Sequence, residues 1–235
     1  MVLSSQVAVP GQRAVAASNI RLFWQSTIGK KVVMAATGLI MVGFVIAHML
    51  GNLQVFVGPE RMNAYAAFLR STGELLWVAR AVLLAAVVLH IIAAVQLTRV
   101  DRAARVVSYT RLEPQASTVA SRTIRWGGLA LALFIVFHLL HFTTGTIRPA
   151  PFSHTDVYAN VIGGFRVWWV TAIYVLAMVA LALHLYHGTW SSFRTLGLSR
   201  PSPSPFRRRA AAVVTLIVWL GFTVVPLAVF ARLVR

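Results

Sequence analysis

Apolar residues are concentrated in five separate stretches of the chain, and polar or basic residues fill the segments between them. Each stretch is about twenty residues long, which as an α-helix is enough to cross ~30 Å of hydrocarbon. The pattern therefore predicts an all-α membrane protein with a bundle of five transmembrane helices. The predicted spans cover about residues 32–53, 76–97, 124–144, 167–188 and 210–231.

The segments outside the spans are predicted to be short and mostly irregular. Residues 1–31 form a leader and an interface segment, and residues 32–235 form one membrane domain. The stretch 54–74 contains Gly58 and Pro59 followed by alternating apolar and polar positions, which predicts a turn and a short amphipathic surface helix. Three polar loops are expected, at 99–123, 145–166 and 189–209.

Composition and charge agree with this class and set its orientation. Hydrophobic residues make up 58% of the chain and charged residues 11%, against roughly 25% charged in a soluble domain. Of the 22 Lys and Arg residues, 15 fall before the first span or in the 99–125 and 189–209 segments. The positive-inside rule then places the N-terminus in the cytoplasm and the C-terminus outside. The net charge of +17 is accounted for in this way, without a nucleic-acid partner.

Four histidines lie inside the first four spans, one for each span, at His48, His90, His138 and His184. An ionisable residue within the membrane is costly and indicates a functional site. At ~1.5 Å per residue, His48 and His138 both lie ~21–24 Å from the cytoplasmic face. His90 and His184 lie within ~10 Å of that face, because their spans run in the opposite direction.

Two histidines therefore share an outer plane and two share an inner plane, ~12–20 Å away. Each pair comes from two different helices, which is the arrangement that holds a haem iron between two imidazoles. We expect two haems in the bundle core. Helix–helix hydrogen bonding is the structural alternative for a single histidine, and zinc is less suitable because no carboxylate or thiol accompanies the imidazoles.

Two further histidines compete for these roles. His141 follows His138 by three positions, and His187 follows His184 in the same way. A small residue beside a ligand leaves room for a haem edge; Gly188 supports His184, whereas Gly145 after His141 makes His141 an alternative to His138. His154, in an outer loop, is expected to be a solvated residue.

Other polar residues lie at the predicted membrane faces. Ser26, Lys31, Arg122 and His187 are expected near the inner pair, where they could bind haem propionates, a quinone carbonyl or lipid phosphate. Anchoring at the interface is an equal alternative for each of them. Glu60, Glu74, His154 and Asp156 are the candidates for protonation on the outer side.

Several motifs of the chain resemble a known family. They are TGLIMVGFVIAHMLGNLQVF around His48, GPERMNAYAAFL after it, SRTIRW before the third span, FHLLHFTTG at His138 and LHLYHGTWSSFRTLG at His184. They resemble the membrane anchor of succinate:quinone oxidoreductases (succinate dehydrogenase or fumarate reductase, complex II), most closely its single-subunit, five-span, two-haem cytochrome b558 type. The resemblance covers about residues 22–198 and favours His138 over His141 and His184 over His187.

This resemblance implies a role in electron transport. His90 and His184 would hold the iron of an inner, proximal haem b, and His48 and His138 that of an outer, distal haem b. A partner flavoprotein would oxidise succinate, and a partner iron–sulfur subunit would dock on the basic cytoplasmic loops, since this chain has no cysteine for a cluster. Menaquinone is the expected quinone, the bacterial cytoplasmic membrane the expected location, and trimers of complexes are compatible with the family.

Two other functions fit parts of the pattern. One is a di-haem cytochrome b anchor for another membrane oxidoreductase, such as a hydrogenase or formate dehydrogenase. The other is a haem-free membrane anchor or transporter whose histidines hydrogen-bond or relay protons. The spans show no internal repeat and contain no Asp or Glu, which weakens the transporter alternative.

Overall fold

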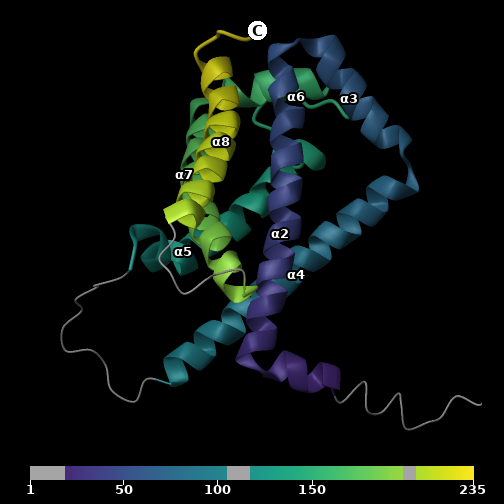
Figure 1. Ribbon diagram of the computed structural model, residues 1–235. Coiled ribbons are helices and arrows are strands. Elements are labelled where there is room, and N and C mark those ends of the chain that lie inside the picture. The colour runs from purple at the N-terminus through teal and green to yellow at the C-terminus, as the bar shows by residue number, and fades with distance from the viewer. Residues whose placement is uncertain (1–18, 105–116, 198–204) are drawn as a thin grey trace, which may run out of the picture.

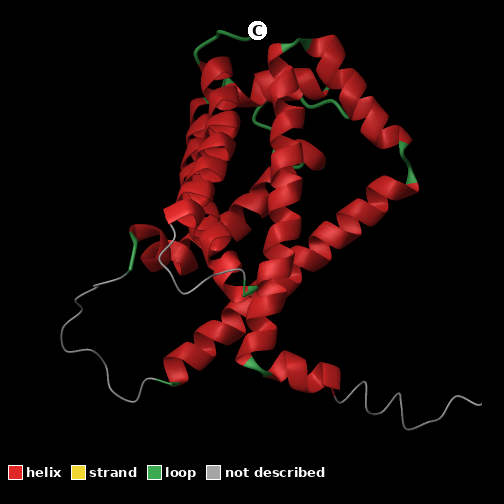
Figure 2. Cartoon of the chain, in the orientation of Figure 1, coloured by secondary structure: helices red, strands yellow, loops and turns green. Residues whose placement is uncertain are grey.

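A computed structural model describes residues 19–104, 117–197 and 205–235 (Figure 1). Within these ranges all regular secondary structure is helical, with no strand (Figure 2). Five helical segments in the described ranges are long and apolar enough to cross a membrane. They contain α2 (Thr27–Asn52), α4 (Glu74–Ala103), α5 (Val119–His138), α7 (Trp168–Thr195) and α8 (Pro205–Phe230). The prediction of a multi-pass, all-α protein with five spans is confirmed.

The helices extend beyond the apolar stretches that predicted them. α2 begins at Thr27 because the Ser26 side chain caps it, accepting a hydrogen bond from the Gly29 backbone N–H at 2.8 Å. Thr118 and Ser121 form a reciprocal capping box that starts α5 within the predicted 99–123 loop. Hydropathy locates the part of a helix that lies in hydrocarbon, whereas the N-terminal cap determines the residue at which the helix begins. Residues 1–18 of the predicted leader, 105–116 and 198–204 lie outside the described residues.

The sequence predicted a loop over residues 145–166, but the structure shows that this segment also contains a helix. It contains α6 (Val157–Phe165), whose N-terminus is capped by the Asp156 carboxylate accepting from the Ala159 N–H at 2.9 Å. Two other short elements complete the same end of the bundle: a 3₁₀ turn, Leu53–Phe56, and α3 (Pro59–Ser71), which confirms the expected surface helix. The α6 helix is too short to span a membrane, so hydropathy over a long window passes over it.

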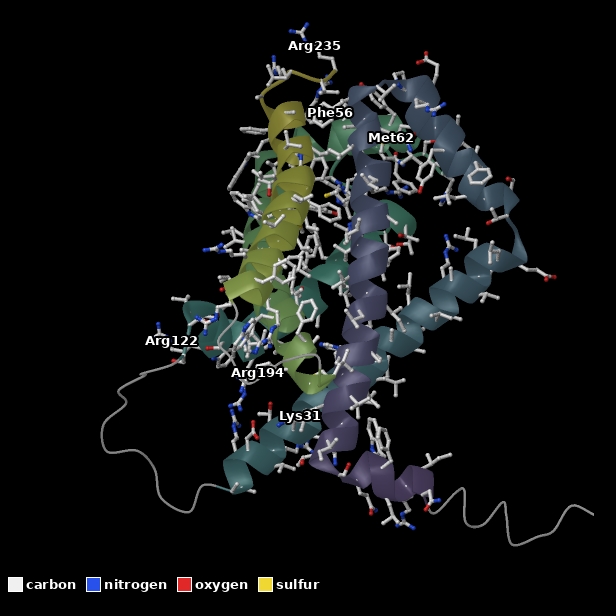
Figure 3. The ribbon with its side chains drawn as sticks, viewed as in Figure 1. Lys31, Phe56, Met62, Arg122, Arg194 and Arg235 are labelled. Carbon is white, nitrogen blue, oxygen red and sulfur yellow. The ribbon has the colours of Figure 1, made fainter. Side chains whose placement is uncertain are left out.

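The two ends of the bundle differ in structure. α3, α6 and the C-terminus gather at one end, called here the C-terminal end, and α2 starts at the other, the N-terminal end (Figure 1). Lys31, Arg122 and Arg194 lie towards the N-terminal end, and Phe56, Met62 and Arg235 at the C-terminal end (Figure 3). A buried apolar cluster joins the short helices to the long ones at the C-terminal end; it includes Val55, Met62, Phe165, Tyr174 and Val229.

The long helices pack as a row in which α4 lies against α2, α2 against α7, and α7 against α5, with α8 against α7 and α2. Large apolar side chains on their outer surfaces remain open, among them Leu84, Leu133 and Leu176 at 67%, 65% and 69% exposure. Such surfaces suit contact with lipid, where a water-soluble protein would bury them. Contacts between the histidine-bearing helices α2 and α5, and between α4 and α7, are much sparser than those between the neighbours in this row.

Candidate functional site: two imidazole pairs in the bundle

The four span histidines meet in two pairs. His48 of α2 faces His138 of α5 with ring centroids 5.7 Å apart, and His90 of α4 faces His184 of α7 at 6.1 Å. The ring planes are inclined by 80° in the first pair and by 54° in the second. The structure therefore brings together the same residues that the depth arithmetic placed in common planes. We call His48 and His138 the outer pair and His90 and His184 the inner pair.

The spacing of both pairs suits one metal ion between two imidazoles. An imidazole nitrogen binds a metal at about 2.0 Å, and the ring centre lies about 1.1 Å behind that nitrogen, so two opposed ligand rings have centres about 6 Å apart. Within the described residues, no group of three or more His, Cys, Asp or Glu side chains is arranged to hold a metal. A closed structural zinc site would require four ligands. Haem requires only the two axial imidazoles from the protein, so these residues fit haem better.

At the inner pair, neighbouring groups fix the orientation of His90. Its Nδ1 lies 3.1 Å from the Met34 carbonyl oxygen and 3.2 Å from the Thr37 hydroxyl, both on α2. The Thr37 hydroxyl itself donates to the Val33 carbonyl at 2.7 Å, so it accepts from His90. Nδ1 of His90 therefore carries the proton, which leaves Nε2 as the lone-pair nitrogen available to a metal.

Two glycines leave space beside the inner pair. A Cβ at Gly38 of α2 would lie 3.5 Å from the Cε1 of His90, and one at Gly128 of α5 would lie 3.8 Å from the Cε1 of His184. A methyl group would fit at either position, but a larger side chain would meet the imidazole. The Nδ1 of His184 is buried and has no hydrogen-bond partner in the described structure, which makes it the orphaned polar atom of this pair.

At the outer pair, the second histidine of the third span, His141, has different contacts from His138. Nδ1 of His138 and Nδ1 of His141 both lie 3.1 Å from the Tyr174 hydroxyl of α7. His141 sits in a π-helical turn, Leu139–Thr143, that directly continues α5. It is only 3% exposed, and its ring stacks on Phe142 at 3.9 Å instead of facing His48. Between the two alternatives at this position, the geometry favours His138 as the partner of His48.

Gly145 does not have the role that the sequence suggested. Its φ of 65° lies in the left-handed region, and a Cβ there would collide with the Phe152 ring. The glycine is therefore required by the backbone turn that ends the third span. It gives no support to His141 as a haem ligand.

The residues expected near the inner pair do not form one cluster. Lys31 and Arg122 are exposed, and no hydrogen bond, ion pair or ring contact within the described residues joins any two of Ser26, Lys31, Arg122 and His187. Ser26 is occupied as the cap of α2, since its hydroxyl also donates to the Phe23 carbonyl at 2.8 Å. His187 is half-buried, and its ring centroid lies 6.3 Å from that of Trp190. The guanidinium groups of Arg194 and Arg208 lie over the Trp190 ring, 5.4 and 5.2 Å from its centroid.

Asp156 is held by two partners at the C-terminal end. It caps α6 through Ala159 and accepts a hydrogen bond at 2.9 Å from the Asn63 side-chain amide of α3. The Ala159 N–H and then the Asn63 amide lower the pKa of Asp156 below its ordinary value of 3.8. Asp156 is therefore ionised at neutral pH and links α6 to α3. Its contacts are those of a structural carboxylate.

Sequence reasoning missed Thr37, Gly38, Gly128 and Tyr174. Their positions relative to the histidines depend on lateral helix packing, which a single sequence does not display. The adjacent Thr37 and Gly38 give a weak local signal. A hydroxyl group beside a position without a side chain, in one turn of a span, can accommodate a polar ring from a neighbouring helix. Tyr174 gives a comparable signal, because a buried tyrosine hydroxyl usually has a hydrogen-bonding partner.

Comparisons with protein-family models, with curated proteins and with solved structures find no match to this chain. The fold and the two imidazole pairs define a five-span helical membrane protein with candidate bis-histidine sites at two depths.

Proposed function

We propose that the chain is a di-haem cytochrome b membrane anchor that carries electrons between a cytoplasmic iron–sulfur subunit and membrane quinone. The observation that carries the proposal is the meeting of four intramembrane imidazoles in two pairs, each at the spacing of two axial ligands. When bound, a haem at each pair supplies one-electron chemistry. Two such centres at different depths give a route across much of the bilayer.

The chain's own residues would hold and orient the two centres. His90 and His138 present their Nε2 atoms because their Nδ1 atoms are engaged by Met34 and Tyr174. A porphyrin would lie between the two ligand-bearing helices of each pair, which are joined mainly through a third helix. The surrounding helices are apolar and exclude water, a condition that favours electron transfer over side reactions.

Within this class, we propose a succinate dehydrogenase or fumarate reductase as the parent complex, with menaquinone as the quinone. The support is the motif resemblance described above and the basic residues Lys31, Arg122 and Arg194 towards the N-terminal end (Figure 3). On this proposal the N-terminal end faces the cytoplasm and binds the iron–sulfur and flavoprotein subunits. Succinate chemistry itself would take place on the flavoprotein.

A pyridine haemochrome assay on the purified chain, with protein quantified in the same sample, tests the cofactor. We expect two b haems per chain. A well-folded protein without haem would overturn the di-haem proposal and leave a structural role for the histidines. Affinity purification of the tagged chain from gently solubilised membranes tests the parent complex, since a flavoprotein and an iron–sulfur protein are expected to co-purify. Recovery of a hydrogenase or formate dehydrogenase instead would assign the anchor to that enzyme.

A further inference from the structure

The Tyr174 hydroxyl occupies a fixed position between two histidines of the same neighbouring helix. It lies 3.1 Å from Nδ1 of His138 and 3.1 Å from Nδ1 of His141. The Tyr174 ring is 6% exposed and is held edge-on between the rings of Phe134 and Phe165, each with its centroid 4.9 Å away. The hydroxyl therefore cannot turn to water and can pair only within the bundle.

Counting protons gives this contact a direction. A tyrosine hydroxyl has one proton to donate and two lone pairs that accept. If His138 uses Nε2 for the iron, its Nδ1 carries a proton and donates to Tyr174. Tyr174 then donates its own proton to Nδ1 of His141, which must be the unprotonated nitrogen of that ring. The order of donation follows from His138 being the ligand.

The surroundings of His141 suit the end of such a chain. A Cβ at Gly164 of α6 would lie 3.0 Å from both Cε1 and Nε2 of His141, so this edge of the ring faces α6. Next to it is a cavity of about 10 Å³, bordered also by Arg148 and Asn160, which is about the space of one water molecule. The Cε1–Nε2 edge of His141 therefore lies against α6, and the ring borders a small cavity at the C-terminal end.

We propose that Tyr174 is a positioning residue that selects His138 as the outer iron ligand and lowers the midpoint potential of the outer centre. This inference rests on the proposed di-haem function. A hydrogen bond from the non-ligating nitrogen makes an imidazole a stronger donor to iron, which favours the ferric state. His141 strengthens the effect, because it accepts a hydrogen bond from the Tyr174 hydroxyl and so makes the phenol oxygen a better acceptor for the hydrogen bond from His138.

The first test is a potentiometric titration of Tyr174→Phe, followed by the visible spectra of the two haems. The His90→Ala variant, which should retain only the outer centre, assigns the two potentials. We expect Tyr174→Phe to keep two haems and to raise the outer potential, by about 59 mV if the ferric preference falls tenfold, with the inner potential unchanged. Tyr65→Phe is the matched control, since the Tyr65 hydroxyl makes no hydrogen bond in the described part of the chain.

The second test separates the ligand from its support and does not depend on the folding of Tyr174→Phe. The Oδ1 atom of asparagine can accept the hydrogen bond from the Tyr174 hydroxyl in place of Nδ1 of His141. His141→Asn should therefore keep both haems at nearly native midpoint potentials. His141→Leu removes the acceptor and should keep both haems while raising the outer potential. An unchanged outer potential in Tyr174→Phe or His141→Leu, or loss of the outer haem in His141→Asn, would overturn the proposal. Absence of haem from the parent protein would instead refute the di-haem function itself.

Discussion

Nδ1 of His90 on α4 lies 3.1 Å from the backbone carbonyl oxygen of Met34 on α2. A carbonyl can only accept, so this contact fixes the proton of His90 on Nδ1 and leaves Nε2 as the nitrogen with a free lone pair. It also ties α4 to α2 at the level of the inner pair. His90 of the inner pair is thus oriented by a third helix, whereas His138 of the outer pair is oriented by the side chain of Tyr174.

Loss of one inner ligand should remove one haem only. In His90→Ala, the haem content is expected to fall from two to one per chain, because the outer pair lies on α2 and α5 and keeps both imidazoles. Haem content by pyridine haemochrome and the spectrum of the remaining haem check this. His154→Ala, an exposed loop histidine, should retain both haems. Equal loss of both haems in His90→Ala would contradict the pairing.

The space beside His90 should tolerate a methyl group and no more. Gly38→Ala places its Cβ 3.5 Å from the imidazole, an ordinary contact, and should keep the inner haem. Gly38→Leu should displace the ring and lose the inner haem while the outer haem remains. Gly43→Leu is the matched control on the same helix, because Gly43 has nothing within 4 Å of its Cβ position. Equal haem content in Gly38→Leu and Gly43→Leu would show that Gly38 does not limit the site.

The Asp156 contact should make stability depend on pH in acid. Because the folded-state pKa of Asp156 is lowered, its carboxylate stabilises the fold fully above the unfolded value of 3.8, and the effect is lost as the pH falls through the folded-state pKa. In thermal unfolding experiments in detergent, Asp156→Asn should have a lower unfolding temperature than the native protein at pH 7. This difference in unfolding temperature should become smaller as the pH falls. A gap that is constant with pH would exclude the charge as its cause.

The cap itself can be measured separately from the charge. Asp156→Ala removes the acceptor for the Ala159 N–H and the partner of Asn63, and should cost about 1 kcal/mol. Asparagine at this position keeps an acceptor oxygen, so at pH 7 Asp156→Asn should lose less free energy of unfolding than Asp156→Ala. Equal losses in the two variants would assign the whole effect to the charge.

The orientation across the membrane can be tested with single cysteines, since the native chain has none. Thr155→Cys, at the C-terminal end, should react with an impermeant maleimide in intact cells. Ser117→Cys, an exposed position before α5, should react only after the membrane is opened. The reverse labelling pattern would contradict the orientation inferred from the Lys and Arg distribution and would place the basic end outside.

The sequence alone determined the class of the fold and the depth of its polar residues. Apolar length and helical rise are local properties, so they fixed five spans and put His48 with His138 and His90 with His184 in common planes. The same local signals did not find α6, because its nine residues are too few for a spanning stretch and its stability depends on burial of Ile162 and Phe165. Capping by Ser26 and Thr118 likewise extended two spans beyond their apolar limits.

Only the tertiary structure decided which groups surround the histidines. The row of helices places Met34, Thr37 and Gly38 against His90, and it places Tyr174 between His138 and His141. These neighbours come from helices distant in sequence, and their rotation about the helix axes is set by side-chain packing that no single span encodes. Depth along the membrane normal can be read from one helix, whereas lateral position requires all of them.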